Sequence, residues 1–461
     1  FAALAPLLGG REGALPCCCS LDAPRCAGPG GASLRESCFW EALCALRAEI
    51  EANDGMTAFF ARRLAAAAAR LGHRGRRMRD GAPRIEAAYE TARREGAVVP
   101  APLQLAPGTA TTLRNELGRA LQYLNRVSGG AFFVTAADLL GSTSANRVAE
   151  DFPPGYWNAA TNPGSRTLPV GGICEDAMAG VIAGLGSFGR HIGVAFSYAA
   201  FIAPLGHVAA RLHAIGNQAR HAADGTPYRP MMLVCAHAGL KTGEDGPTHA
   251  DPQALQLLQE NFPPGIAITL TPWDPQEIWP LLTAALTRRP AVIAPFVTRP
   301  DETIPDREAL GLAPAHAARS GVYRLRTAGG PADGALVLQE SAATFAFVAD
   351  VLPRLERKGI DLDVWYVASA ELFDALSTGE RERIFPEERA QEAMGITGFT
   401  LATMYRWIRS DRGRASTLHP YLKGHYLGSG PGAAVLEEAG LGPESQYRAI
   451  LGYVDAMARS R

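Results

Sequence analysis

The sequence predicts an α/β protein in which a helical, partly ordered amino-terminal region precedes two consecutive, mostly parallel α/β domains. From about residue 110 onward, short apolar runs alternate with segments of helical periodicity. Buried strands separated by amphipathic helices are typical of a mostly parallel sheet covered on both faces. A turn-rich stretch at 299–334 divides these segments into two series. We therefore expect an amino-terminal region at 1–105 and domains at 106–310 and 311–461.

The alternating segments place the individual elements. In the first series we expect strands at 130–138, 231–236, 265–271 and 290–297, and helices at 112–126, 175–188, 251–260 and 275–287. Short apolar runs, such as Met-Met-Leu-Val-Cys at 231–235, predict the strands, and apolar residues at helical spacing predict the helices. In the second series the same patterns predict strands at 335–338 and 361–367, and helices at 341–357 and 439–458.

The first hundred residues differ in composition from the rest. They are rich in Ala, Gly, Arg and Cys, with helical stretches expected at 36–52 and 56–71. Six of the eight cysteines lie within the first 44 residues. Their spacing lacks the paired Cys-x-x-Cys pattern of zinc sites, and disulfide frameworks belong to short secreted chains. We therefore expect reduced thiols, and no metal site, in a cytoplasmic protein.

Composition and charge exclude several function classes. Apolar residues make up 47% of the chain, and 45 basic residues nearly balance 46 acidic ones. This balance argues against a protein that neutralises nucleic-acid phosphates or lies on an anionic membrane. The longest apolar run, at 192–206, is broken by Ser197, Tyr198 and Pro204, so it falls short of the eighteen or so residues of a membrane span. We expect neither a nucleic-acid nor a membrane partner.

The densest polar segment, at 236–249, follows the apolar run at 231–235 directly. It contains His237, Asp245 and His249 together with a glutamate and three glycines. Open α/β sheets bind ligands at the carboxyl ends of their strands, and histidines and carboxylates can move protons near neutral pH. On composition alone, a ligand-binding loop and a solvated turn are equally good interpretations.

Two strings in the chain resemble a known enzyme family. The string Gly-Glu-Asp-Gly-Pro-Thr-His at 243–249, with a histidine twelve residues before the last one, resembles the signature of transketolase, which depends on thiamine diphosphate. Deoxyxylulose-phosphate synthase, a relative, usually has alanine where Glu244 stands. The string Gly-Ile-Cys-Glu-Asp-Ala-Met at 172–178 resembles the motif around the glutamate that activates the cofactor. The resemblance covers about 110 to 461.

The resemblance implies roles for residues at the cofactor. Glu175 hydrogen-bonds the aminopyrimidine ring and favours its imino tautomer; without the motif it would be read as an acid stabilised at a helix amino terminus. Asp138 lies near the cofactor at a subunit interface, and Phe196 and Tyr198 are the aromatic contacts of the ring. The spacing of this aromatic segment differs from that of the family, and Phe201 lies in the same region.

The resemblance also implies a site for the substrate. Arg114, Ser142 and Arg299 hold the phosphate of a sugar phosphate, a role that suits the forked guanidinium. His249 and Asp245 bind and polarise the hydroxyls and carbonyl of the donor, while His237 assists at the phosphate end.

One motif of a complete transketolase is absent from the sequence. No Gly-Asp-Gly occurs, although the family uses this motif, followed by an asparagine, to hold the divalent metal and the diphosphate. The third domain also has Gln-Glu-Ser-Ala-Ala at 339–343 where the family has Ala-Thr-Gly-Ser-Glu. We therefore expect Mg²⁺ or Ca²⁺ on a partner chain that carries the diphosphate-binding domain, in a dimer of such pairs, unless the chain is a fragment.

These observations lead to one main hypothesis and two alternatives. The main hypothesis is one subunit of a thiamine diphosphate-dependent transketolase, which moves a two-carbon glycolaldehyde unit from a ketose phosphate to an aldose phosphate. The first alternative is another thiamine-dependent carbon–carbon ligase or lyase, motivated by the altered aromatic segment. The second is a non-catalytic structural or regulatory subunit of the same fold.

Overall fold

The computed structural model describes residues 31–75, 78–137, 139–240, 249 and 251–459, and the chain divides into two compact units, Phe1–Ala82 and Pro83–Arg461. The described residues of the first unit form two helices, α2 (Gly31–Ala52) and α3 (Asp54–His73), close to the expected ranges. Asn53 separates them, and its side chain caps α3 by accepting a 2.9 Å hydrogen bond from the Met56 backbone N–H. No described residue of α3 is buried.

A parallel sheet of five strands forms the centre of the second unit, in the order β2-β3-β4-β6-β5. The strands are β2 (Phe132–Ala136), β3 (Ile192–Ser197), β4 (Met231–Cys235), β5 (Ala267–Leu270) and β6 (Val292–Pro295). Nearly all of their residues are buried. This burial explains why the strands read as continuous apolar runs rather than as alternating patterns.

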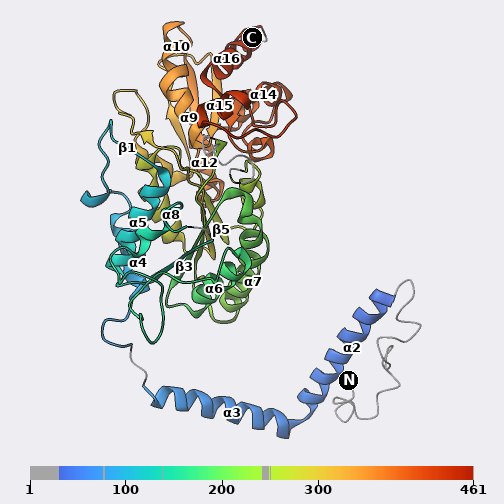
Figure 1. Ribbon diagram of the computed structural model, residues 1–461. Helices are drawn as coiled ribbons and strands as arrows, with labels where there is room; N and C mark the ends of the chain where they lie inside the picture. The colour runs from blue at the N-terminus through green and yellow to red at the C-terminus, as the bar shows by residue number, and fades with distance from the viewer. Residues whose placement is uncertain (1–30, 76–77, 138, 241–248, 250, 460–461) are drawn as a thin grey trace. The chain divides into compact units, whose positions relative to one another are not determined.

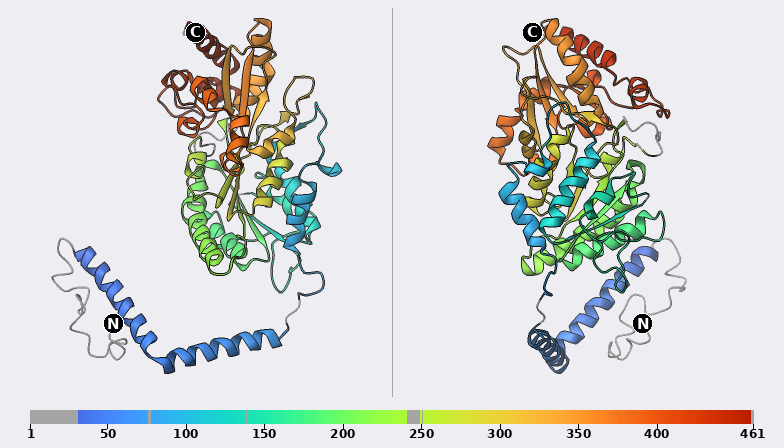
Figure 2. Two further views of the ribbon diagram at one scale, coloured as in Figure 1. Left: turned by 180° about the vertical axis from the view of Figure 1, so that it is seen from behind. Right: turned by 60° about the vertical axis from the view of Figure 1, so that its left-hand side comes forward.

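Helices cover both faces of this sheet (Figure 1). One face packs against α4 (Ile85–Glu95), α5 (Leu113–Val127) and α8 (Ile278–Arg288), and the other against α6 (Glu175–Phe188) and α7 (Arg211–Asp224). Figure 2 shows the same two layers from behind. Residues of α4 therefore contribute to the core of the sheet. The Trp279 Nε1–H on α8 donates to the carbonyl oxygen of Glu95, the last residue of α4, at 3.0 Å.

A second sheet has four strands in the order β11-β9-β10-β8, in which only β8 runs antiparallel to its neighbour. Its strands are β8 (Val322–Arg326), β9 (Gly334–Gln339), β10 (Leu362–Val367) and β11 (Met394–Thr397). The helices of this domain are α9 (Ser341–Ala346), α10 (Leu352–Arg357), α11 (Ala370–Asp374), α12 (Thr378–Ile384), α13 (Glu387–Glu392), α14 (Asp411–Ser416), α15 (Gly432–Glu438) and α16 (Pro443–Ala458). A short antiparallel pair, β1 (Ala110–Thr111) and β7 (Glu302–Thr303), completes the unit. The expected fold class of two mostly parallel α/β domains is thus confirmed.

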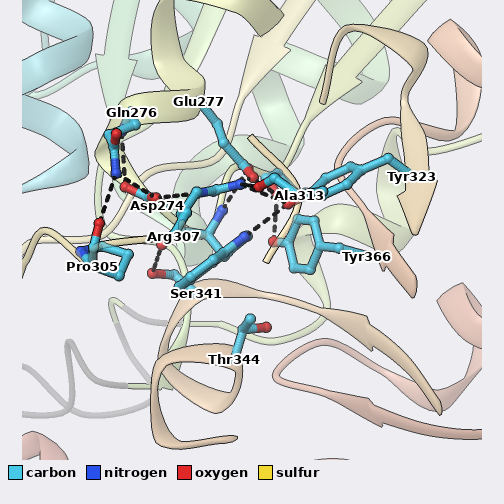
Figure 3. A network of polar contacts seen from close by, with 12 residues as sticks. Asp274, Gln276, Glu277, Pro305, Arg307, Ala313, Tyr323, Ser341, Thr344 and Tyr366 are labelled. Carbon is cyan, nitrogen blue, oxygen red and sulfur yellow. Dashed lines mark hydrogen bonds and ion pairs between the residues drawn. The ribbon is translucent and has the colours of Figure 1, made fainter. Parts of the chain in front are cut away.

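A buried polar network joins the two sheets (Figure 3). Arg307 donates from Nε to Asp274 Oδ2 and from Nη2 to Glu277 Oε1, both at 2.7 Å. Tyr323 on β8 also donates its hydroxyl to Glu277. The Tyr366 hydroxyl on β10 donates to the Thr271 carbonyl oxygen, just after β5, at 2.6 Å. Because these partners come from both sheets, the network fixes one domain against the other.

Several details differ from the sequence-based expectation. The helix expected at 251–260 is wrong: this stretch has turns and a short 3₁₀ helix at Ala254–Leu257, since Asn-Phe-Pro-Pro at 261–264 stops it before it can lengthen. The helix expected at 341–357 is broken by a π-helical turn at Phe347–Val351, directly before the segment with Pro353, whose nitrogen has no hydrogen to donate. Several elements had not been expected, among them the strands β1, β3, β7, β8 and β11 and the helices α4 and α7. None of the helices in the described part of the chain has the length and apolar character needed to cross a membrane.

Candidate active site

The candidate site lies where the strands of the five-stranded sheet end. Ala137 follows β2, Ser197 ends β3, and His237 comes two residues after β4. These strands are neighbours and run parallel, so their carboxyl ends meet at one edge of the sheet. Ligands of open α/β sheets bind at this edge.

A cavity of about 260 Å³ opens beside Ala137 and Ser197. Three lining residues are apolar, Ala137, Ile173 and Phe201, and the others are polar or aromatic: Thr143, Glu175, Ser197, Tyr198 and His249. Glu175 is thus the only carboxylate among the lining residues that the structure describes. An apolar, aromatic wall with one carboxylate suits a flat heterocyclic ring that presents a nitrogen to the carboxylate.

Glu175 is held at the cavity by the start of helix α6. The preceding residue, Cys174, is extended and caps the helix without a side-chain hydrogen bond. Glu175 is in the first turn, where the helix dipole favours a carboxylate. The Ser197 hydroxyl donates to Glu175 Oε1 at 3.1 Å, the one hydrogen bond to this side chain among the described residues. The second carboxylate oxygen is therefore available to a ligand.

Four rings, those of Tyr198, Phe201, His237 and His249, pack together at the cavity. Tyr198 packs against His237 with ring centroids 4.1 Å apart and against His249 at 4.9 Å. Phe201 contacts His249 edge-on at 5.6 Å. Tyr198 is only 7% exposed, so its ring orients both histidines. This packing brings together side chains from the ends of β3 and β4.

A basic cluster adjoins the rings. Arg114 Nη1 lies 2.9 Å from His237 Nε2, which is also 3.1 Å from the Ser142 carbonyl oxygen. A guanidinium can only donate and a carbonyl oxygen can only accept, so the two contacts require opposite tautomers of His237. The Ser142 hydroxyl lies 3.1 Å from that of Tyr198. The Arg114 backbone N–H donates to the Thr298 carbonyl oxygen at 3.4 Å. Arg299 directly follows Thr298, so the backbone segments that carry the two arginines are neighbours.

The structure brings most of the sequence-predicted residues together. Glu175, Tyr198 and His249 line the cavity, and Arg114, Ser142 and His237 form the adjoining basic cluster. Phe196 does not line the cavity: its side chain is fully buried and packs with the core on the side of Val194. Adjacent strand residues point to opposite faces, so Ser197 reaches Glu175 and Phe196 cannot. Asp138 and Asp245 lie outside the described residues.

The sequence analysis assigned no site role to five residues that line the cavity: Ala137, Thr143, Ile173, Ser197 and Phe201. In the sequence, Ser197 is only a break in the apolar run at 192–206. The signal was a hydroxyl at the end of a strand-length apolar segment, the position where an α/β sheet places ligand contacts.

The titration behaviour of the buried groups around the sheet follows from burial. Burial lowers the pKa of His213 and His191 and raises the pKa of the Cys235 thiol. No group of three or more His, Cys, Asp or Glu residues in the described part of the chain is arranged to hold a metal ion.

Comparison with known proteins supports the resemblance read from the sequence. Residues 109–299 match the family model of the transketolase pyrimidine-binding domain. The transketolase of Aquifex aeolicus is 28% identical over 225 residues, which are 48% of this chain and 30% of that protein. The transketolase of Streptococcus pyogenes is 27% identical over 286 residues, 60% of this chain and 35% of that protein. The chain thus spans about a third of the length of the curated relatives it matches.

The fold agrees with the sequence comparison. The structure of transketolase from Leishmania mexicana superimposes with a TM-score of 0.63 and 17% identity, covering 93% of this chain and 55% of that one. At this identity the match concerns the fold alone. The expected resemblance to the carboxyl-terminal portion of transketolase is confirmed.

Proposed function

We propose that this chain, which corresponds in sequence and fold to the carboxyl-terminal portion of transketolase, is one subunit of a thiamine diphosphate-dependent transketolase. The complete enzyme would move a two-carbon glycolaldehyde unit from a ketose phosphate to an aldose phosphate. The observation that carries the proposal is the position of Glu175, on the wall of an apolar cavity with one carboxylate oxygen held by Ser197.

The cavity fits the aminopyrimidine ring of the cofactor. Its apolar and aromatic wall can cover the faces of the ring, and the oxygen of Glu175 that Ser197 leaves unbound can accept a hydrogen bond from a ring nitrogen. When bound, thiamine diphosphate supplies the carbon nucleophile of the reaction. Glu175 would hold a proton at the ring nitrogen, and Tyr198 and Phe201 would keep water from the ring.

The basic cluster provides a place for the substrate. Arg114 and Arg299, presented by neighbouring backbone segments, offer forked guanidinium donors for a sugar phosphate. His249 is held by Tyr198 and Phe201 at the cavity wall, where its ring would bind a donor hydroxyl. His237 Nε2 lies 2.9 Å from Arg114 Nη1 and would orient that arginine toward the phosphate.

The diphosphate and its divalent metal, Mg²⁺ or Ca²⁺, are assigned to another chain, in a dimer of such pairs. The support is the sequence given, in which no Gly-Asp-Gly motif occurs. Carboxylate oxygens are the donors that such hard cations require.

Intact mass spectrometry of the natively purified complex tests this assignment. We expect a stoichiometric partner of about 30 kDa, the size of a two-domain polypeptide, and turnover of a ketose phosphate only when an aldose phosphate acceptor is present. Turnover of a donor without such an acceptor would instead establish another thiamine-dependent ligase or lyase. A complex with neither cofactor nor turnover would establish a non-catalytic subunit.

A further inference from the structure

A second pocket, which we call the edge-strand pocket, lies in the carboxyl-terminal domain and has a volume of about 550 Å³. Its lining includes Arg319, Arg324, Arg383, His316, Tyr323 and Trp365. Strand β8, which carries Arg324, is one of the two edge strands of the four-stranded sheet. The pocket therefore has no residue in common with the candidate active site.

The lining of the edge-strand pocket is strongly cationic. It contains three arginines and a histidine, and none of the described lining residues is acidic. Arg319 is half-buried, and its guanidinium donates only to neutral groups, the Gly96 carbonyl oxygen at 2.6 Å and the Thr283 hydroxyl at 3.0 Å. Among the described residues it has no ion-pair partner. A partly desolvated cation without a counter-charge is unusual in a folded protein.

The Arg324 side chain is fixed in place, and its Nε donor has no hydrogen-bond partner in the described structure. It lies opposite Trp365 in the strand register and over its ring, 4.9 Å from the centroid. One end of the guanidinium donates to Asp363 at 2.7 Å, whereas the Nε atom is buried without a hydrogen-bond partner in the described structure. Asp363 is shared with Arg389. The Asp363 carboxylate beside Arg324 is therefore paired with two arginines.

Arg383 completes the cluster from helix α12. It is exposed and forms no ion pair with any described residue. Tyr323 faces the pocket from β8, but its hydroxyl donates inward to Glu277. The polar groups that the edge-strand pocket offers to a ligand are consequently almost all cationic donors.

We infer that the edge-strand pocket binds a phosphorylated small molecule. Arginine forks match the geometry and charge of a phosphate group. The volume exceeds what inorganic phosphate needs and lies within the range of pockets for small organic ligands, so the ligand class is a phosphate ester. This inference does not rest on the function proposed above, because it uses none of the residues of the candidate active site.

Titration calorimetry on the full chain tests the inference, with phenyl phosphate as the probe. We expect saturable binding that weakens with added salt, and an affinity reduced about tenfold to a hundredfold in Arg383→Glu, as expected when a charge-assisted contact is replaced by repulsion. Arg383→Gln is the milder second variant. An unchanged unfolding midpoint shows that each variant folds.

Two matched variants distinguish binding in the edge-strand pocket from binding elsewhere on the chain. Arg357→Glu changes an exposed arginine of α10 that lies outside the pocket and bonds only the Pro353 carbonyl oxygen, so binding should be unaffected. Arg299→Gln removes a proposed phosphate residue of the active site and should also leave this binding intact. The inference is overturned if phenyl phosphate does not bind, if Arg383→Glu and Arg357→Glu weaken binding equally, or if Arg299→Gln alone abolishes it.

Discussion

Replacing Arg307 by methionine tests how strongly the buried network holds the two domains together. The guanidinium contacts Asp274 and Glu277, whose side chains have no solvent exposure, and lies 4.8 Å from the centroid of the Trp273 ring. Burial raises the pKa of Glu277, and the Arg307 charge opposes this rise. Removing the cation leaves two buried carboxylates without a counter-charge, so we expect a loss of about 3–5 kcal/mol in the free energy of unfolding.

Urea denaturation followed by tryptophan fluorescence measures this loss. The matched control is Arg448→Met, which removes an arginine whose side chain is 77% exposed and pairs with Glu444 one helical turn away, and it should cost less than about 0.5 kcal/mol. Without Arg307 the pKa of Glu277 should rise further. The folded state then binds a proton that the unfolded state releases, so the defect should grow as the pH rises above about 5. A loss below about 1 kcal/mol at pH 8 would refute the expectation for a buried, uncompensated charge.

Two further predictions concern Gly239, which follows strand β4, and His213, which lies on helix α7. Gly239 has φ of +80°, and a β-carbon there would lie 2.2 Å from a carboxylate oxygen of Glu340, so Gly239→Ala should cost about 2–4 kcal/mol from strain and overlap. Gly225→Ala, at φ +70° with open space around it, should cost only about 1 kcal/mol, and equal losses in thermal unfolding would show that the Glu340 contact does not matter. Burial lowers the pKa of His213, so the unfolded state binds more protons and stability should fall as the pH drops below about 6.5, by at most roughly 1.4 kcal/mol per pH unit. His213→Gln should flatten that part of the pH profile, and an unchanged slope would show that other groups cause it.

The sequence predicted those parts of the fold that depend on local pattern. The apolar run at 231–235 followed by His237 is a strand that leads into polar residues, and the structure has β4 there. Strand β3 was missed because Ser197 and Tyr198 interrupt the apolar run that contains it. Both line the cavity, so the residues that disturbed the pattern are the ones that line the site.

Other features depend on contacts that no local pattern contains. Phe196 was assigned to the ring by its place in the sequence, but the alternation along β3 turns it into the core. The Arg307 network joins residues from segments more than thirty positions apart. In the sequence, its acids and its arginine look like ordinary surface residues, because charged side chains are seldom fully buried unless they are paired.

The most direct test of the central claim is the turnover of the native complex with Glu175→Gln, measured with a ketose phosphate donor and an aldose phosphate acceptor. Glutamine keeps the shape of the side chain but loses its charge, so kcat should fall at least about 100-fold, while the complex still assembles. Asp176→Asn changes the adjacent acid in the same helical turn, which does not line the cavity, and should retain nearly full activity. Turnover of the Glu175→Gln complex within about threefold of the unaltered complex would contradict the assignment of this cavity to the cofactor.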